Sequence, residues 1–455
     1  MKQKRIFLFQ WKYARVFTLI FLTALTFLIS CSKSDDPSPS PATTATISSV
    51  TSPTGTTSGP KNTVITITGT NFITDLTKIQ VKVNGKSCVV ISATGTAITA
   101  RIPAGCGTGI VELFLDGTRY AGPVFNFVYT YTLSSITDGQ TGSNVYGPLA
   151  SAKFDEIESV SIDQNDNIFL GQYDYPKVKK ISATNIVSLV AGSGTFGYFD
   201  GNGATAQFAT PEYTCPASDG NLYVGDADKV RKIDASGNVT TLYTSPASTQ
   251  LFGIKAMPSG IYLGGSNVIA KISYSGVLIW AVQTKPPQPP FTDDYDLDGD
   301  TSVAKFNTYG NIEVDSTEQN IYFNNLDYSN SINGHSVWKI KKLNIAAHTI
   351  TTISGAKTGV EANDGPALQA TFNVIADIHF DKFGVLWIAD GQNNKIRILK
   401  DGIVSTIIGS LGSGDVDGDP SVAKIIYPTG LAFDSHGSLF IGCVGNNKIK
   451  KLVID

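Results

Sequence analysis

The chain has 455 residues, of which 16% are charged, 44 are glycine and only two are methionine. This length predicts two or three domains, and the abundance of glycine and aromatic residues favours β structure over a helical or disordered chain. The formal net charge of −3 excludes the strongly basic surface by which proteins bind nucleic acid, so no nucleic-acid partner is expected.

Residues 1–30 have the pattern of a signal peptide. The uncharged apolar run VFTLIFLTALTFLIS at 16–30 follows five basic residues, Lys2, Lys4, Arg5, Lys12 and Arg15. The run is shorter than the roughly 20 residues that a membrane-spanning helix needs. Cleavage during export is therefore expected.

The sequence Leu28-Ile29-Ser30-Cys31 resembles the lipobox of bacterial lipoproteins, in which the cysteine is lipidated and is the N-terminal residue after cleavage. The resemblance implies a lipid anchor on Cys31; the alternative is a chance cysteine beside a signal peptide. Ser32 argues against retention in the inner membrane, and SKSDD after the cysteine resembles surface-export signals of Bacteroidetes lipoproteins. We therefore expect a lipid-anchored protein of the outer membrane, with exposure at the cell surface as one alternative and the inner side as the other. Residues 31–46 are expected to form a Ser/Pro-rich linker.

Residues 47–129 are expected to form a small antiparallel β-sandwich. Apolar and polar residues alternate in VITIT (64–68), IQVKV (79–83) and VELFL (111–115), which turns one face of each strand inward. The segment SPTGTTSGPKNTVITITGTNF, followed by VKVNG and IPAGCGTG, resembles an IPT/TIG domain, which has an immunoglobulin-like fold. Such domains are commonly spacers or interaction modules.

Two cysteines, Cys88 and Cys106, lie within this domain. An exported chain enters a compartment that permits disulfides, so a bridge between them is one expectation and two free thiols are the other. Cys215 and Cys443 lie at different positions of a repeat in the second domain, and we expect them to be buried thiols.

The second domain, residues 130–455, contains an internal repeat. Five segments align without gaps: YGPLASAKF (146–154), DGNGATAQF (200–208), DGDTSVAKF (298–306), DGPALQATF (364–372) and DGDPSVAKI (417–425). A strand ends 19 residues after each repeat alanine, and a basic strand such as KVRKI and then a β-branched strand follow it. Residues 251–282 keep the strands without the Asp-Gly pair.

Six copies of four short strands indicate a six-bladed β-propeller. The copies resemble NHL repeats, most closely in IADGQNNKIRIL (388–399) and IGCVGNNKIKKL (441–452). The last copy lacks a fourth strand, and TYTLSSITDG (130–139) matches the missing one. We therefore expect the N-terminal strand of this domain to close the ring, which removes its open edges.

The stretch DDYDLDGD (293–300) resembles the start of a calcium loop, with Asp294, Asp296 and Asp298 as weak candidate ligands. An EF-hand would also need a glutamate at its twelfth position, where this chain has Lys305. Because the Asp-Gly pair recurs in four repeats, a structural turn at the entrance of each innermost strand is favoured. No cofactor other than this weak calcium site is expected.

Loops after the second and fourth strands of each blade are expected on one face of the propeller. The long ones, at 172–176, 284–300 and 324–336, suggest a binding surface there. Its candidate ligand-binding side chains, suited to stacking on sugar rings, are Tyr173, Tyr175, Phe291, Tyr295, Tyr328 and His335. The alternative is that these side chains pack on their own blades.

These patterns predict a non-enzymatic binding module of the cell envelope, with a glycan as the leading ligand class. The preference for glycans rests partly on analogy with Bacteroidetes surface lipoproteins. A scaffold for envelope proteins is the second hypothesis. A metal-dependent lyase or hydrolase, which the NHL resemblance brings in, is the third; Glu313 and His379 alone would make a poor metal site. The sequence makes no prediction about oligomeric state.

Overall fold

The computed structural model describes residues 44–142, 144–246, 249–284, 296–332, 335–357, 359 and 361–455, with only the backbone at 328–332 and 335. The predicted signal peptide, Cys31 and most of the linker lie outside these ranges. Within them, no helix is long and apolar enough to cross a membrane. The chain divides into two compact units, and every strand of the described residues belongs to the second, Thr46–Asp455.

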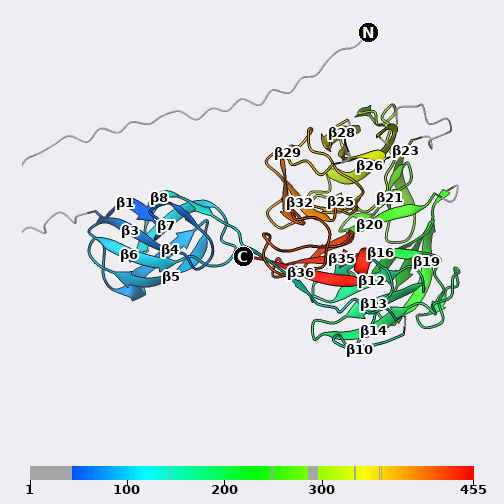
Figure 1. The fold of residues 1–455 in the computed structure, drawn as a ribbon, viewed down its shortest axis with the longest axis horizontal. Helices are drawn as coiled ribbons and strands as arrows, with labels where there is room; N and C mark the ends of the chain where they lie inside the picture. Colours follow the sequence, from blue (N-terminus) through cyan, green and yellow to red (C-terminus); the bar gives the residue numbers. More distant parts are fainter. Residues whose placement is uncertain are drawn as a thin grey trace, which may run out of the picture. The chain divides into compact units, whose positions relative to one another are not determined.

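The first domain is an eight-stranded β-sandwich (Figure 1). Its hydrogen-bonded strand order is β1-β3-β6-β5-β4-β7-β8-β2. Alternate residues of β3 point into the core, where Ile65 and Ile67 are fully buried. The strands are β1 (Thr46–Thr51), β2 (Ser58–Gly59), β3 (Val64–Thr70), β4 (Ile79–Val83), β5 (Lys86–Ala93), β6 (Ala97–Arg101), β7 (Gly109–Leu115) and β8 (Thr118–Phe127), with a 3-10 turn, η1 (Leu76–Lys78), before β4.

Six antiparallel sheets follow as the blades of a propeller (Figure 1), as the repeat predicts. Blades 1 to 3 consist of β11 (Ile157–Ile162), β12 (Ile168–Gln172), β13 (Lys177–Ile181) and β14 (Ile186–Ala191); β16 (Pro211–Pro216), β17 (Leu222–Asp226), β18 (Lys229–Ile233) and β19 (Asn238–Thr244); β20 (Leu251–Met257), β21 (Gly260–Gly265), β22 (Val268–Ile272) and β23 (Leu278–Gln283).

Blades 4 to 6 consist of β25 (Ile312–Val314), β26 (Asn320–Ile332), β27 (His335–Asn344) and β28 (Thr349–Ser354); β30 (Ile375–Phe380), β31 (Leu386–Asp390), β32 (Lys395–Lys400) and β33 (Ile403–Ile408); β34 (Pro428–Phe433), β35 (Leu439–Cys443), β36 (Lys448–Ile454) and β9 (Tyr131–Ser135). The first strands of successive blades contact one another in a closed circle, from β11 through β16, β20, β25, β30 and β34 back to β11. They are therefore the innermost strands, around a central channel.

The ring closes as the sequence predicts. Strand β9 is the outermost strand of blade 6, antiparallel to β36, with Leu133 opposite Leu452 and Tyr131 opposite Ile454. The last blade is therefore completed by a strand that precedes the first blade in the chain, and neither end of the array has an open edge.

The alanine of each repeat and the phenylalanine two residues later, which is Ile425 in the last copy, are buried between blades. In blade 2, Ala206 and Phe208 are fully buried and share a cluster with Val178 and Ala191 of blade 1. A buried phenylalanine stabilises the fold by roughly 1.5–3 kcal/mol relative to an exposed one. The gapless spacing of this motif reflects its fixed place between neighbouring blades.

The Asp-Gly pair lies at the outer edge of the four blades that contain it, so the expectation that it enters the innermost strand is wrong. Gly365 and Pro366 form a two-residue fifth strand, β29, that pairs with β33, the outermost full strand of the same blade. The corresponding short strands are β10 (Gly147–Pro148), β15 (Gly201–Asn202) and β24 (Gly299–Asp300). Gly365 has a φ of 132°, which glycine accepts without strain.

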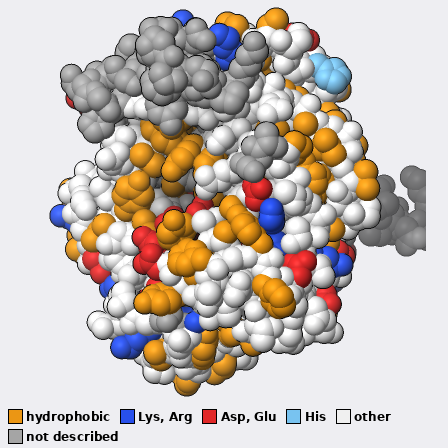
Figure 2. Space-filling model, turned by 90° about the vertical axis from the view of Figure 1, so that its right-hand side faces the viewer, with side chains coloured by type: hydrophobic (Ala, Val, Ile, Leu, Met, Phe, Trp, Pro, Cys, Tyr) orange, Lys and Arg blue, Asp and Glu red, His pale blue; other side chains and the backbone are white. Residues whose placement is uncertain are grey.

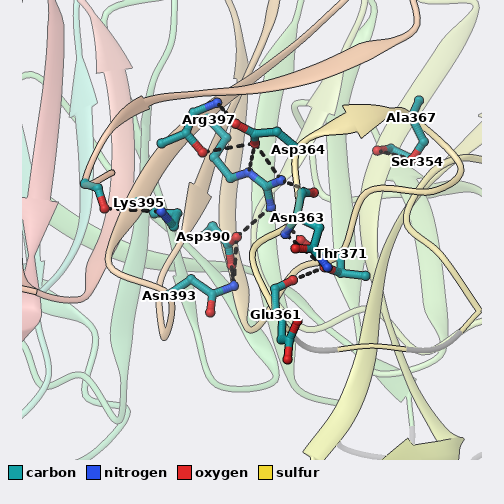
Figure 3. A network of polar contacts seen from close by, with 12 residues as sticks. Ser354, Glu361, Asn363, Asp364, Ala367, Thr371, Asp390, Asn393, Lys395 and Arg397 are labelled. Atoms are coloured by element: carbon teal, nitrogen blue, oxygen red, sulfur yellow. Dashed lines mark hydrogen bonds and ion pairs between the residues drawn. The ribbon is translucent and has the colours of Figure 1, made fainter. Parts of the chain in front are cut away.

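The aspartate of the pair fastens two strands of its blade together. Asp364 accepts hydrogen bonds from the guanidinium of Arg397 on β32 at 2.9 Å and from the backbone N–H of Thr406 on β33 at 2.8 Å. Figure 3 shows Arg397 between Asp364 and Asp390, the last residue of β31. The same set recurs in three other blades: Asp200, Arg231 and Thr241; Asp298, Lys341 and Thr352; Asp417, Lys450 and Ser135.

The two remaining blades show what replaces this fastening. Blade 3 has neither the Asp-Gly pair nor the basic residue, because Ala270 stands at the basic position. Blade 1 keeps Lys179 but has Tyr146 in place of the aspartate, and the ammonium lies 5.3 Å from the centre of the Tyr146 ring. Burial lowers the pKa of Lys179 to about 8, and the charge of Asp155 opposes this shift only in part.

The sequence suggests a long loop at 324–336, but its described residues, 324–332 and 335–336, extend the second and third strands of blade 4 instead. The ladder between β26 and β27 continues through Asp327 opposite Val337. The polar residues Asn324, Asn325 and Asp327 are buried here. The stretch therefore resembles a loop in composition although it pairs as a hairpin.

Candidate ligand-binding site

The innermost strands have a β-bulge near their first residue. In blades 1, 2, 3, 5 and 6 the pairing register with the second strand shifts by one residue there. The residues skipped are Glu158, Glu212, Phe252, Ala376 and Thr429. These positions lie where five of the six innermost strands begin, and a bulge there redirects its extra side chain.

Three of these bulge residues, Glu158, Glu212 and Phe252, line one cavity of about 880 Å³ on blades 1 to 3. Loop residues after the second strands, such as Tyr173 and Asp228, and after the fourth strands, such as Tyr198, complete its wall. Hydrophobic and acidic side chains gather around a hollow in the molecular surface (Figure 2). The cavity therefore opens on the face to which the sequence assigns the long loops.

Aromatic side chains form much of the wall. Tyr173, Tyr198, Tyr213, Phe252 and Tyr309 all contribute. Phe252 is 7% exposed and packs at 4.7 Å, between ring centres, on Tyr309, which is 49% exposed. Tyr173, 39% exposed, has support from an edge-on contact with another ring. These rings are held by neighbours yet still present surface to a ligand.

Carboxyl groups provide the polar part of the cavity. Burial, followed by repulsion from Glu156 and Asp174, raises the pKa of Glu158 to about 7. Burial, followed by repulsion from Glu158 and Asp226, raises the pKa of Glu212 to about 7. Within the described part of the chain, neither side chain has a hydrogen bond or an ion pair. Two adjacent blades thus present partly buried acids without a compensating cation.

The cations near the cavity are already paired. Lys229 lies 3.1 Å from Asp228 and 4.6 Å from the centre of the Tyr198 ring. Arg231 is fully buried and contacts Asp226 at 2.8 Å. The groups that remain at the cavity surface therefore leave it with excess negative charge.

The interior of the channel holds a separate ionic cluster. Glu313 lies 2.8 Å from the ammonium of Lys255 and 2.7 Å from Nδ1 of His379. Burial would raise the pKa of Glu313, but Lys255 and His379 hold it at about 2. Among the residues with described side chains, no group of three or more His, Cys, Asp or Glu is placed to hold a metal ion.

The predicted ligand residues have different outcomes. Tyr173 lines the cavity, whereas Tyr175 is 51% exposed and is not part of its lining. Phe291 and Tyr295 lie outside the described residues, and Tyr328 and His335 are described by backbone only.

The described aspartates of the calcium-like stretch are engaged by lysines. Asp298 and Asp296 contact the ammonium of Lys341 at 2.6 and 2.7 Å, and Asp296 also contacts Lys339. Asp294 lies outside the described residues. Fastening of the blade accounts for the carboxylate of Asp298.

In the first domain, Cys88 and Cys106 are buried free thiols in the structure. Burial raises the pKa of the Cys88 thiol to about 12 and that of Cys106 to about 11. Formation of the disulfide stays a prediction.

The two cavity glutamates do not lie in long loops, so the search for long loops does not identify them. Glu158 and Glu212 each lie six residues after a repeat alanine, where the other gapless copies have Gly310, Ala376 and Thr429. An acid at one register position in two adjacent repeats is a signal in the alignment itself. Only the bulge, however, turns that position toward the channel mouth.

Comparisons with known proteins agree with this architecture. Residues 45–131 match the family model of the IPT/TIG domain. A search for curated relatives by sequence finds no match. One similar solved structure is a structural genomics protein of unknown function from Bacteroides thetaiotaomicron, with 20% identity and a TM-score of 0.63, covering 91% of this chain and 99% of that chain.

Two further similar structures are auxiliary nutrient binding proteins. The one from Bacteroides thetaiotaomicron has 16% identity and a TM-score of 0.53, covering 90% of this chain and 97% of its own. The one from Bacteroides ovatus has 17% identity and a TM-score of 0.53, covering 90% and 98%. At this identity the likeness shows a common fold along nearly the whole chain.

Proposed function

We propose that the protein is a non-enzymatic binding module of the cell envelope and that it holds a glycan in the cavity at the channel mouth. The observation on which this rests is the combination of fixed aromatic rings and carboxyl groups around a cavity of about 880 Å³. Ligand sites commonly have volumes of roughly 300–1,000 Å³ and few, well-placed polar groups.

A glycan fits this chemistry better than a purely apolar ligand does. The C–H faces of sugar rings stack on aromatic side chains, and sugar hydroxyls hydrogen-bond to carboxyl groups. Tyr173 and Tyr309 present exposed ring surface, and Glu158 and Glu212 lie in the same wall. The cavity is built on strand ends of several blades, so its shape is set by the scaffold.

Two other observations support a binding role at the envelope. Similar solved structures include proteins named as auxiliary nutrient binding proteins. The lipobox-like sequence ending at Cys31 would attach the chain to a membrane by a lipid, and the acidic residues after it favour the outer membrane and the cell surface.

A glycan array with the purified chain, followed by calorimetry on the best ligand, tests the proposal. Tyr173→Ala removes a stacking ring, worth about 0.5–1.5 kcal/mol, and should weaken binding by roughly 2- to 12-fold. Tyr175→Ala is the matched control, because Tyr175 is an exposed tyrosine two residues away that does not line the cavity. Absence of glycan binding, with co-purification of an envelope protein, would favour the scaffold hypothesis instead.

A further inference from the structure

We infer that the ligand of this cavity has a protonated amine, as in a glycan with free amino sugars, and that the amine lies between Glu158 and Glu212. The inference rests on the proposed function and adds the charge of the ligand to it. It follows from which acids of the propeller have a partner and which do not.

Other buried acids of the same region are compensated within the chain. Asp226, at the end of β17, is fully buried and accepts hydrogen bonds from Arg231 and from the backbone N–H groups of Ala209 and Thr210. Glu313, in the channel, has Lys255 and His379. This is the usual arrangement, because burying a carboxylate without a partner is costly.

Glu158 and Glu212 depart from this arrangement. They come from adjacent blades, line the same cavity and have no hydrogen bond or ion pair among the described residues. Each of them is the extra residue of a β-bulge and has no partner residue on the second strand of its blade. The bulge directs its side chain toward the channel mouth. Two unpaired acids directed into one aromatic cavity are complementary to a cation that arrives with the ligand.

The aromatic wall favours an ammonium over a metal ion as that cation. An ammonium is attracted to the face of an aromatic ring as well as to carboxylates, and the chain already has this contact between Lys229 and Tyr198, at 4.6 Å. A metal ion would need a group of at least three ligating side chains, and the residues that the structure describes contain no such group.

The charged groups around the pair predict a proton-linked affinity. Glu156, Asp174 and Asp226 repel the two glutamates, while the nearby cations, Lys229 and Arg231, are held by Asp228, Asp226 and Asp200. Both glutamates have a pKa raised to about 7. A bound ammonium stabilises the ionised form, so binding should release protons and tighten as the pH rises from about 5 to about 7.

Three tetrasaccharides with the same β-1,4-linked backbone test the inference: a glucosamine tetramer, an N-acetylglucosamine tetramer and cellotetraose. They differ only in the group at C2, which is an ammonium, an acetamide or a hydroxyl. Calorimetry at pH 6.5 with the purified full chain should show at least tenfold tighter binding of the glucosamine tetramer. Its measured heat should vary with the ionisation enthalpy of the buffer, as proton release requires.

The variants Glu158→Gln and Glu212→Gln keep the side-chain shape and remove the charge, so each should reduce the preference for the amine by at least fivefold. Glu361→Gln is the control, since Glu361 is an exposed glutamate of the propeller outside the cavity lining. Equal binding of the three sugars, or a preference that survives both substitutions, overturns the inference and leaves the proposed function standing. Failure of the glucosamine tetramer to bind also overturns it; failure of every glycan on the array instead overturns the proposed function.

Discussion

The closing strand provides a test of how the propeller is held together. Asp417 of blade 6 accepts hydrogen bonds from the backbone N–H of Ser135 at 2.8 Å, from the Ser135 hydroxyl at 3.1 Å and from Lys450 at 2.7 Å. Asp417→Ala removes all three bonds and leaves Lys450 paired with Asp415, at 2.6 Å. Ser135 belongs to β9, so the substitution should loosen the strand that closes the ring.

The magnitude follows from the exposure of the carboxylate. A hydrogen bond to a charged group is worth about 1.5–3 kcal/mol when buried, but the side chain of Asp417 is 45% exposed and water screens part of that energy. Because Lys450 keeps a second carboxylate, no cation is left unpaired. We expect a loss of about 2 kcal/mol in the free energy of unfolding, and a midpoint lowered by a few degrees.

Asp364→Ala is the matched comparison. Its side chain is 44% exposed and makes the equivalent contacts within blade 5, to Arg397 and Thr406. Both variants should lower the thermal midpoint by similar amounts. Hydrogen exchange separates them: Asp417→Ala should accelerate exchange in β9, whereas Asp364→Ala should accelerate it in β33. If Asp417→Ala leaves the midpoint and the exchange of β9 unchanged, the carboxylate does not secure the ring.

Three further predictions concern other parts of the chain. Because the pKa of Glu158 is raised, the folded state binds more protons than the unfolded state between pH 4.5 and about 7. The contribution of this group to stability therefore falls as the pH rises across that window. Glu158→Gln should unfold at a higher temperature than wild type at pH 8, and a lower thermal midpoint there would contradict this. Tyr146→Asp should pair with Lys179 and be about 1 kcal/mol more stable to denaturant than Tyr146→Asn; equal stability would argue against a fastening role for the carboxylate. Cys31→Ser should abolish incorporation of labelled palmitate into the protein, and labelling that persists would argue against a lipid anchor on Cys31.

Much of the fold could be predicted because its signals are local and repeated. The buried alanine and phenylalanine recur at fixed spacing, since each pair fits the same gap between blades. The missing fourth strand of the last copy points directly to β9 as its replacement. The position of the Asp-Gly pair was not predictable in this way, because the chain crosses from the outer to the inner edge of a blade between Gly365 and Ile375.

The site was less accessible to sequence analysis for a physical reason. Tyr173 could be found because it lies in a loop whose face follows from strand parity. Glu158 and Glu212 lie in short strand ends, and their proximity depends on the curvature of the ring and on bulges that sequence does not reveal. The extended hairpin of β26 and β27 has the composition of a loop, because its buried polar residues are of the types that loops contain.

The pairing of β9 with β36 also imposes an order in time. Ser134 and Lys451, which lie opposite one another, are separated by 317 residues. At the roughly 5–20 residues per second of protein synthesis, about 15–60 s pass between their appearance. Until β36 exists, β9 has no partner in its own blade. A finished ring is thus possible only for a chain that has been made through β36.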